Sequence, residues 1–461
     1  MESLLCNLLI LFVLIVLVIL LFYKYQFSYW RNRGVAHLEP KFPLGNVLWK
    51  KHMLHSLQRM YENLKTKDLF AGGYFFFRPI ALITDLDLIR DILIKDFHNF
   101  TDRGCFYNEK DDPLSASLLT VDGEKWKNLR MKLTPTFRPS KVKFMYPTIV
   151  KVAHELEGTM SGMIQNDNVI EIKDLVARYT TDVIGTCAFG IECNSLRDPT
   201  AEFRVFTRKI LEEPKNNTFV IIFKTYFQNF AKWIGMKLVN EDVSKFFLKV
   251  VRETVQYREE NNIKRNDFMD LLIELKNGTS DDENSQKLGK LTFEEVAAQT
   301  FLFFIAGYET SSITLGFAFY ELAGNQEVQD RARNEINEVL EKHNGHFTYD
   351  ALMEMTYLEQ VLSESLRMYP PIVFLFRLAK EDYYVSRNNR IIEKGTHVVI
   401  PSHAIQYDKD IYPDPEIFDP DRFSPEAVKA RHPMTFLSFG DENYYKNYKR
   451  KTNLLRIAKS I

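Results

Sequence analysis

The sequence predicts a large, mainly α-helical domain with a minor β-sheet, joined to an N-terminal transmembrane helix. Three observations predict this fold class: an apolar run at the N-terminus, long segments with helical spacing of apolar residues, and strand-like patterns confined to two short stretches. The chain has 461 residues, of which 45% are hydrophobic, enough to fill a large core. Its net charge of −1 gives no reason to expect nucleic-acid binding.

The N-terminal helix is expected to cross a membrane. Leu4 to Tyr23 contains one strongly polar residue, Asn7, and is long enough to span a hydrocarbon core of roughly 30 Å. Basic residues follow the run, which predicts that the body faces the cytoplasm. Aromatic residues are expected to form an interfacial belt there: Tyr23, Tyr25, Phe27, Tyr29 and Trp30. The alternative is a cleaved signal peptide, although no small-residue cleavage site follows.

The elements of the body follow in chain order. Glu39 to Gly45 has the composition of a linker, and strand character appears around Ala71 to Ile83. Asp85 to Lys95 opens with an N-cap residue and has helical spacing. Longer helices are expected at Tyr146–Ile164, Lys173–Ala188, Val243–Lys276 and Thr292–Ala323, an exposed connector at Asn277–Gln286, and a strand at Val398–Pro401. No internal repeat and no second domain boundary is evident.

A helix over Glu294 to Ser312 is the first candidate for a functional element. Its segment Phe301 to Ala306 is apolar all round, which predicts a buried helix. Gly307, Glu309 and Thr310 follow directly. The Thr310 hydroxyl can bond the carbonyl of Ala306 four residues back, which bends a helix and opens its backbone. An acid beside a hydroxyl in such a helix is suited to proton delivery. A core helix with a tolerated kink is the alternative.

Three further motifs carry charged side chains at helical spacing. Glu364 and Arg367 share one helix face and are surrounded by leucines, so a buried pair is expected rather than a surface bridge. Arg422, in the segment "FDPDRF", is a candidate to join that pair. Trp126 and Arg130 also share a face, where the arginine either grips an anionic group or lies over the aromatic ring.

In this order and at these spacings, the motifs "WKNLR", "AGYET", "ESLR" and "PDRF" resemble those of the cytochrome P-450 family of haem-thiolate monooxygenases. The phrases "NFTDRG" and "AAQTFLFFIAGYETSS" are similar to the insect microsomal detoxification branch. The resemblance covers roughly residues 1 to 440. It implies the cytochrome P-450 fold, truncated at its C-terminal end, with a membrane anchor over residues 1–30, a catalytic-type domain over 31–440, and an aberrant tail over 441–461.

The resemblance also implies roles for single residues. Thr310 and Glu309 would manage protons during dioxygen cleavage, and Ala306 and Gly307 would flank the oxygen pocket. Haem propionates would be held by Trp126, Arg130 and Arg377, and Glu364, Arg367 and Arg422 would form a structural triad. The implied partners are an NADPH-cytochrome reductase, cytochrome b5, membrane lipid and lipophilic small-molecule substrates. The implied location is the endoplasmic reticulum membrane, with a single-pass anchor and the body in the cytoplasm.

The segment after Phe439 departs from the family pattern. The family continues with a glycine-rich loop around the haem cysteine, but the cysteine position holds Lys446 and the flanking glycine positions hold Glu442 and Tyr448. All four cysteines of the chain lie in its first 193 residues. The tail is rich in Lys, Asn and Tyr, which indicates a frameshift or a retained intron starting near Asp441. In principle His432, Tyr445 or Tyr448 could replace the thiolate as an iron ligand, with different chemistry.

Two interpretations of function follow. One is a typical monooxygenase, which converts a lipophilic substrate with dioxygen and two electrons from NADPH. The other, favoured for this chain as written, is a non-catalytic membrane-anchored product that binds apolar ligands. Apolar residues in Thr218 to Gly235 either contact the membrane surface or form a core helix. A lysine cluster is a candidate docking face for an acidic reductase, unless it is simply a solvated surface: Lys125, Lys127, Lys132, Lys141 and Lys143.

Overall fold

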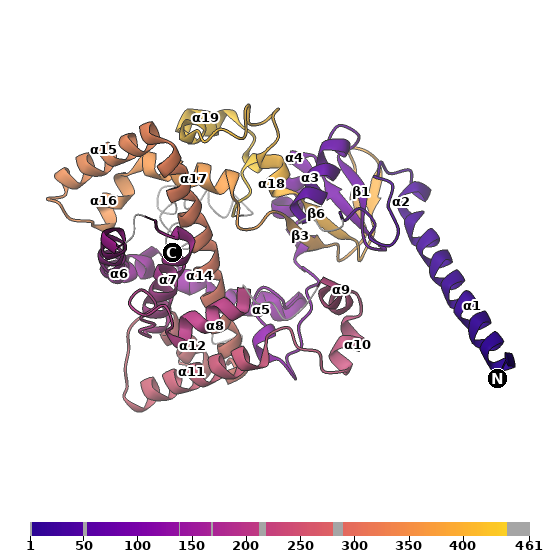
Figure 1. Ribbon diagram of the computed structural model, residues 1–461, viewed down its shortest axis with the longest axis horizontal. Coiled ribbons are helices and arrows are strands. Elements are labelled where there is room, and N and C mark those ends of the chain that lie inside the picture. Colours follow the sequence, from indigo (N-terminus) through magenta and orange to yellow (C-terminus); the bar gives the residue numbers. More distant parts are fainter. Residues whose placement is uncertain are drawn as a thin grey trace. The chain divides into compact units, whose positions relative to one another are not determined.

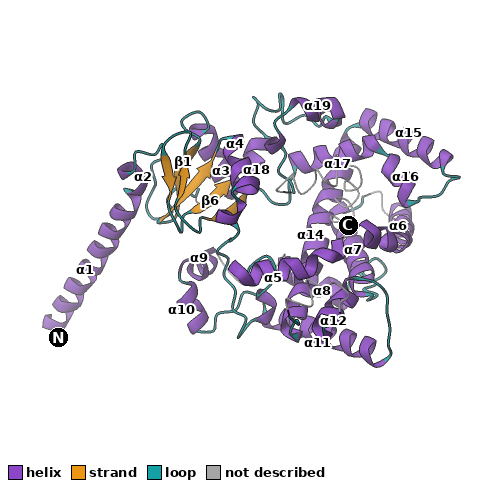
Figure 2. Cartoon of the chain, turned by 180° about the vertical axis from the view of Figure 1, so that it is seen from behind, coloured by secondary structure: helices purple, strands orange, loops and turns teal. Residues whose placement is uncertain are grey.

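A computed structural model of the chain describes residues 2–48, 53–137, 139–166, 169–211, 218–279 and 289–439. These residues form two units, shown in Figures 1 and 2. The first unit comprises residues up to 102, 372–417 and 426–439, and the second comprises 103–371 and 418–425. Gly440 and the aberrant tail, residues 441–461, lie outside the described residues, as does most of the predicted connector Asn277–Gln286.

The first unit combines the N-terminal helix with the sheets. Its elements are α1 (Glu2–Phe27), α2 (Tyr29–Asn32), α3 (Met53–Leu64), β1 (Phe70–Phe75), β2 (Arg78–Ile83), α4 (Leu86–Arg90), β3 (Leu375–Leu378), β4 (Tyr383–Val385), β5 (Arg390–Ile392), β6 (His397–Ile400), α18 (Ser402–Gln406) and most of α19 (Pro425–Ala430). The main sheet has the order β1-β2-β6-β3, and β4 pairs with β5. The predicted strands at Ala71–Ile83 and Val398–Pro401 are therefore confirmed.

The sheet joins segments far apart in the chain. β1 and β2 form an antiparallel hairpin, and β6 then pairs parallel to β2, with Ile80 opposite His397. At the start of α4 the predicted N-cap is present, because the Asp85 side chain accepts a 2.7 Å hydrogen bond from the Leu88 backbone N–H. A buried apolar cluster of the sheet, α3 and α4 includes Met60, Tyr74 and Val398.

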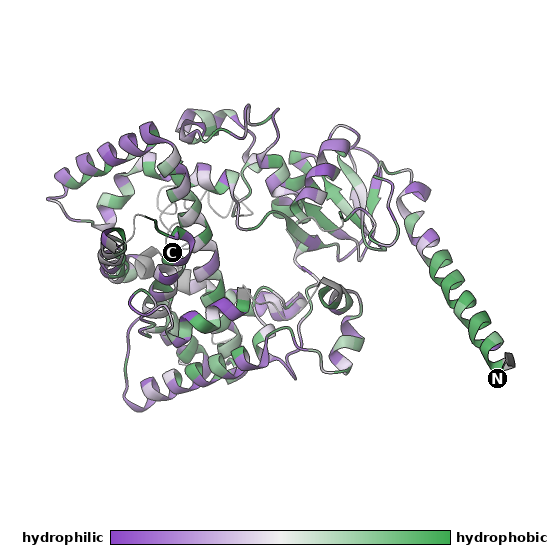
Figure 3. Ribbon diagram, in the orientation of Figure 1, coloured by the Kyte–Doolittle hydropathy of each residue, from purple (hydrophilic) through white to green (hydrophobic). Residues whose placement is uncertain are grey.

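The N-terminal helix α1 has the length and composition of a membrane span. The most apolar 18-residue window of residues 4–27 has a mean hydropathy of 3.5 and is not buried by the rest of the chain, and Figure 3 shows the apolar colour along the helix. Among the described residues, a second helix, α14, meets the same criteria of length and composition, but it is partly buried inside the second unit. The prediction of an N-terminal membrane anchor rests on α1.

The predicted aromatic belt is wrong at Trp30. The Trp30 side chain is fully buried in the core, and its indole N–H donates a 3.0 Å hydrogen bond to the carbonyl of Gly73. A side chain at Gly72 would occupy the same space, because an added Cβ would lie 2.3 Å from Trp30 Cγ. Phe27 likewise packs edge-on against Tyr74. These rings therefore attach the anchor to the sheet rather than to the lipid interface.

The second unit is helical. Its elements are α5 (Gly123–Leu133), α6 (Pro139–Asn166), α7 (Ile172–Ile184), α8 (Glu202–Leu211), α9 (Thr218–Tyr226), α10 (Gln228–Trp233), α11 (Glu241–Glu260), α12 (Phe268–Asn277), α14 (Phe293–Gly324), α15 (Gln326–Lys342), α16 (Tyr349–Glu354) and α17 (Thr356–Met368). The longest, α14, packs against α7, α11, α12, α15 and α17. It begins with a capping box between Thr292 and Glu295, which satisfies two backbone donors at its N-terminus.

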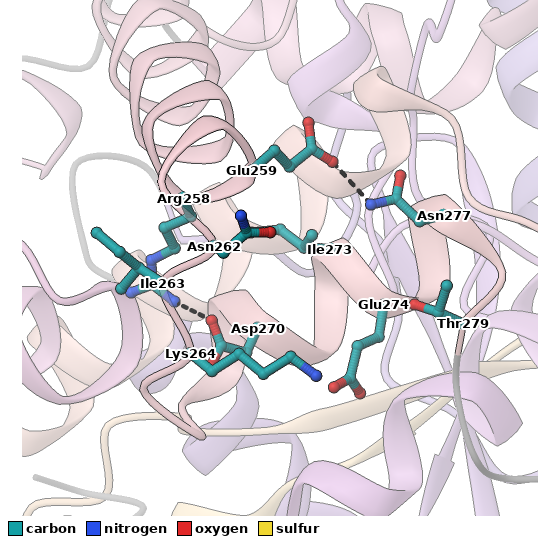
Figure 4. Close-up of a pocket in the computed structure, with 10 residues that line it drawn as sticks. All are labelled: Arg258, Glu259, Asn262, Ile263, Lys264, Asp270, Ile273, Glu274, Asn277 and Thr279. Atoms are coloured by element: carbon teal, nitrogen blue, oxygen red, sulfur yellow. Dashed lines mark hydrogen bonds and ion pairs between the residues drawn. The ribbon is translucent and has the colours of Figure 1, made fainter.

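One predicted helix is two helices. The pattern over Val243–Lys276 predicts a continuous helix, but α11 ends at Glu260 and α12 starts at Phe268. Asn262 and Asn266 adopt positive φ in the turn between them. Arg258 at the end of α11 is buried and pairs with Asp267 and Asp270, which fixes the turn. Arg258 and Asp270 also line a pocket of about 320 Å³ between these helices. Figure 4 shows the side chains that line it.

Candidate functional site

The face of α14 that carries Thr310 has the predicted hydrogen bond. Thr310 Oγ1 donates to the carbonyl of Ala306 at 2.7 Å, four residues back. Two expectations for this helix are wrong, however. Ala306 is exposed and Glu309 and Thr310 are partly exposed, so the helix is not buried all round. Moreover, α14 is α-helical from Phe293 to Gly324, so the threonine does not open the backbone. The acid and the hydroxyl thus lie on a continuous helix beside an exposed position.

Gly307 faces the neighbouring helix α7. A Cβ added at Gly307 would lie 2.7 Å from Cδ1 of Ile184, the last residue of α7. A glycine inside a helix costs about 1 kcal/mol relative to alanine, and here the close approach of two helices offsets that cost. The structure therefore gives Gly307 a packing role and leaves Ala306 as the small residue on the open face.

The predicted triad residues come together in the second unit. Arg367 Nε donates a 2.7 Å hydrogen bond to Glu364 Oε2, and both side chains are fully buried, as the leucine-rich surroundings predict. The Arg422 guanidinium lies 3.5 Å from Glu364 Oε1, and the same oxygen accepts a 3.1 Å hydrogen bond from the backbone N–H of Asp419. Glu364 thus ties α17 to the segment around Arg422.

Trp126 and Arg130 share a face of α5, as predicted. Trp126 is buried, whereas Arg130 is exposed and lies over the indole, with its guanidinium carbon 5.3 Å from the ring centroid. This stacked arrangement agrees with the simpler alternative, a cation over an aromatic ring. It also leaves the guanidinium donors of Arg130 on a face where an anionic group can be bound in a bidentate way.

The sequence analysis gave no role to Arg103, which lies close enough to Arg130 for their charges to interact. Its side chain has a buried nitrogen, Nη1, with no hydrogen-bond partner among the described residues. Burial lowers the pKa of the Arg103 guanidinium, and the like charge of Arg130 acts in the same direction. The carboxylate of Asp122, just before α5, accepts a 2.8 Å hydrogen bond from the backbone N–H of Arg103. A buried guanidinium nitrogen that lacks an acceptor, next to a second cation, fits the carboxylate groups of a haem.

Arg377, the other predicted propionate ligand, belongs to the first unit. It lies on β3, and its Nη1 donates a 2.8 Å hydrogen bond to the carbonyl of Phe376. The lead-in to the predicted cysteine loop is also held in this unit, because Gln406 on α18 accepts a 3.0 Å hydrogen bond from the backbone N–H of Leu437. The first part of that loop is therefore anchored, and the positions of Glu442, Lys446 and Tyr448 lie outside the described residues.

His432 has a structural role that disfavours it as a replacement ligand. Its Nδ1 accepts a 3.1 Å hydrogen bond from the backbone N–H of Met434, and its Nε2 lies 3.4 Å from Asp87 Oδ1. Nδ1 thus caps a short 3₁₀ turn, and Nε2 pairs with Asp87, so both ring nitrogens are engaged. The two tyrosine candidates, Tyr445 and Tyr448, lie outside the described residues.

Only some of the lysines on and after α5 are exposed on the surface. Lys132 is buried, and its Nζ donates to the carbonyl of Lys290 at 3.3 Å, so it is not available for docking. Lys125 pairs with Glu109, and Lys143 lies 3.1 Å from Asp350. Lys127 is exposed and lies 3.8 Å from Glu124. The side chain of Lys141 lies outside the described residues.

Comparison with known proteins identifies related chains over most of this sequence. The family model described as "Cytochrome P450" matches residues 37–441. "Cytochrome P450 6A1" of Musca domestica is 47% identical over 429 residues, which cover 92% of this chain and 84% of that protein. "Cytochrome P450 6a2" of Drosophila melanogaster is 47% identical over 445 residues, covering 93% of this chain and 88% of that protein.

Proposed function

From the premise that this chain belongs to the cytochrome P450 family, we propose that the face of α14 with Glu309 and Thr310 delivers protons during dioxygen cleavage. The family's members are haem monooxygenases, and the similarity to insect proteins places the chain in the same lineage of oxidoreductases. Their reaction inserts one oxygen atom into a lipophilic substrate and consumes two electrons. When bound, haem supplies the activation of oxygen.

The 2.7 Å bond from Thr310 to Ala306 carries this proposal. Because the hydroxyl donates its own proton to a backbone carbonyl, its lone pairs point away as acceptors and its position is fixed. A water molecule can donate to that oxygen and exchange protons with the carboxylate of Glu309, the preceding residue on the helix. The uninterrupted helix α14 carries both groups, and a small residue at 306 leaves room on the exposed face.

A variant of Thr310 tests the proposal in a chain whose tail has been replaced by a family cysteine segment. Thr310→Ala should uncouple oxygen consumption from product formation, because electrons still arrive while proton delivery is impaired. Thr314→Ala is the matched control, since Thr314 makes the same 2.7 Å bond one turn further along but is buried. Equal uncoupling by both variants would assign the effect to the helix rather than to the exposed hydroxyl.

We also propose that Arg103, Trp126 and Arg130 bind one haem propionate and that Arg377 binds the other. The buried, unpartnered nitrogen of Arg103 supports the first assignment. Arg103→Leu should lower haem incorporation, whereas Arg103→Lys should restore it only in part, because lysine keeps the charge but loses the bidentate fork. Haem content per chain, measured by the pyridine haemochrome absorbance of the purified protein, separates these outcomes.

The chain as written is proposed to lack monooxygenase activity. A cysteine thiolate donates electron density that favours O–O cleavage, and Lys446 at its position is a cation at neutral pH. The alternative function is that of a membrane-anchored binder of apolar ligands. The absorption spectrum of the reduced, carbon monoxide-treated protein decides between them. A red-shifted thiolate band would refute the loss of activity, and its absence would support it.

Membrane contact is proposed at α9 and α10, in addition to the anchor α1. Phe227 and Phe230 are each 50% exposed, and Trp233 is 79% exposed, so this surface suits the interfacial region of a bilayer. Phe223 is partly buried against Phe227 and Phe230. In an anchor-deleted chain, Phe223→Asp with Phe227→Asp should reduce binding to liposomes. Tyr257→Asp, at an exposed aromatic position on α11, is the control.

The location and the redox partner follow from these surfaces as proposals. The anchor and its following basic residues support the endoplasmic reticulum membrane with the body in the cytoplasm. The proposed electron donor is a membrane-bound NADPH-cytochrome reductase, with cytochrome b5 as a second donor. Because Lys132 is buried and Lys125 is paired with Glu109, the exposed Lys127 and Lys143 are left to contact an acidic face. Raising salt should weaken that association, since exposed charges are screened beyond about 10 Å at 0.1 M.

A further inference from the structure

The β1–β2 hairpin ends in an apolar turn. Phe75 pairs with Arg78, so only Phe76 and Phe77 form the loop between the two strands. Two-residue loops of this kind favour Asn, Asp and Gly, because at least one loop residue adopts positive φ. Here Phe76 adopts a φ of 55°, and both loop residues are partly exposed. Since this choice strains the backbone and exposes apolar rings to water, the turn suits surroundings that are themselves apolar.

A second turn lies beside the hairpin and adds another ring. This turn, residues 41–45, is joined to the end of β1 by a bridge between Gly45 and Phe75. A glycine is needed at that position, because it has positive φ and a Cβ there would lie 2.5 Å from the carbonyl oxygen of Phe76. The turn carries Phe42, which is 58% exposed.

Both turns contact the last part of the N-terminal helix α1. The Phe77 ring lies edge-on to Phe22, with centroids 5.3 Å apart, and its centroid is 6.1 Å from that of Tyr23. The Phe42 ring lies edge-on to Tyr23, with centroids 4.8 Å apart. Phe42 and Phe77 therefore meet α1 from two separate turns, and we call these two rings the collar.

The collar lies at the depth where a membrane span by α1 would end. Residues 4–23 extend about 30 Å at about 1.5 Å per residue, which matches the thickness of the hydrocarbon core. Tyr23 then lies at the boundary between hydrocarbon and headgroups, and the headgroup layer adds roughly 5–8 Å on each side. Because both collar rings have their centroids within 6.1 Å of the Tyr23 ring, they fall in or beside that layer. Aromatic rings are enriched at this depth.

We propose that Phe42 and Phe77 insert into the interfacial region of the bilayer and seat the first unit on the membrane surface. This inference rests on the proposed membrane anchor α1, and it adds a second contact with lipid that comes from the sheet. Charge supports the same partner, because Lys24 and Lys41 are exposed beside Tyr23 and Phe42 in the sequence, where they can meet lipid phosphates. The interfacial rings are thus brought together by tertiary contacts and do not all belong to α1.

Photo-crosslinking of the full chain in proteoliposomes tests the inference. A photoreactive phenylalanine analogue replaces Phe42, Phe77, Leu14 or Tyr384 in separate variants, and lipid adducts are identified by mass spectrometry. Leu14, in the middle of α1, reports on the anchor alone. Tyr384 is the matched control, because it is also 58% exposed but lies on β4, paired with Ile391 of β5. Positions 42 and 77 should give at least about fivefold more lipid adduct than position 384.

The outcomes separate the collar from the anchor. Adducts at position 14 without adducts at 42 and 77 would overturn the inference and leave the anchor standing. No adduct at position 14 would overturn the anchor, and the inference with it. Equal yields at 42, 77 and 384, or crosslinks from 42 and 77 to a second copy in place of lipid, would also overturn the inference. Circular dichroism checks that all four variants keep the helix content of the parent chain.

Discussion

Glu364 and Arg367 form an ion pair of 2.7 Å in which neither side chain is exposed. Taking both charges out of water costs several kcal/mol, so the pair contributes stability only through its complete set of partners. Glu364 has those partners, since its Oε1 also accepts hydrogen bonds from Arg367 Nη2 at 2.8 Å and from the Asp419 backbone N–H at 3.1 Å. This relationship connects α17 to the segment that precedes the missing cysteine loop.

Removing the arginine should be strongly destabilising. Arg367→Met leaves the Glu364 carboxylate buried without its main partner, and we expect a loss of about 3–5 kcal/mol in the free energy of unfolding. The comparison is Arg333→Met, which removes an exposed pair with Asp330 and should change stability by less than about 1 kcal/mol. Urea denaturation of the full chain in detergent measures both. Similar losses for the two variants would contradict a special role for the buried pair.

The close approach of α14 and α7 gives a second prediction. Gly307→Ala gains about 1 kcal/mol of helix propensity but places Cβ 2.7 Å from Ile184 Cδ1, and overpacking costs about 1–3 kcal/mol. We therefore expect a net loss of up to about 2 kcal/mol. Ile184→Val removes Cδ1 and should restore part of the loss in the double variant.

Gly316 provides the control on the same helix. A Cβ there would lie 3.7 Å from Val176 Cγ2, which is ordinary contact, so Gly316→Ala should stabilise the chain by up to about 1 kcal/mol. Thermal denaturation ranks the three variants. If Gly307→Ala and Gly316→Ala shift the midpoint in the same direction, the contact with Ile184 does not explain the glycine.

The sequence was sufficient to predict features that depend on neighbouring residues, such as an apolar run or two charged residues three or four positions apart. The long apolar N-terminal helix, the Asp85 N-cap, the hydrogen bond from Thr310 to Ala306 and the Glu364–Arg367 pair depend on residues within about one helical turn, or on a run of one polarity. Each of these relationships is visible in a short window of sequence, because helix geometry alone brings the residues together.

The features that were missed depend on contacts between distant segments. Trp30 is buried instead of lying in the predicted aromatic belt, because Gly72, on a strand, provides space for its indole. The break after Glu260 depends on Arg258 meeting two aspartates beyond the turn. Arg103 joins Arg130 through the loop before α5, and no periodic spacing connects these two arginines. A window-based pattern cannot show such tertiary contacts.

His397 predicts how the stability of the first unit changes with pH. Burial, together with the charge of Arg78, lowers the pKa of His397 from 6.5 to about 4. Between these two values the unfolded chain binds more protons than the folded chain, so stability should fall as the pH decreases from about 6.5 to about 4. The loss is at most about 3 kcal/mol.

A neutral substitute should remove that dependence. His397→Gln should flatten the stability profile across this pH range, whereas His154→Gln should not, since the His154 side chain is 66% exposed. Urea midpoints measured at several pH values provide the comparison. A profile for His397→Gln that remains as steep as that of the parent chain would contradict the assignment.

The last prediction concerns repair of the cysteine loop. Lys446→Cys alone should not give a thiolate spectrum, because Glu442 and Tyr448 occupy positions where the family has glycine and where a tight loop needs positive φ or close approach to the haem. A thiolate must also be kept dry and hydrogen-bonded by its surroundings. Replacing everything after Gly440 with a family segment should restore haem incorporation, because Gln406 already anchors the lead-in at Leu437. The same replacement with serine at the cysteine position is the control, and it should give no red-shifted carbon monoxide band. If Lys446→Cys alone formed a stable haem-thiolate, the defect of this chain would be the loss of one ligand rather than of the loop that supports it.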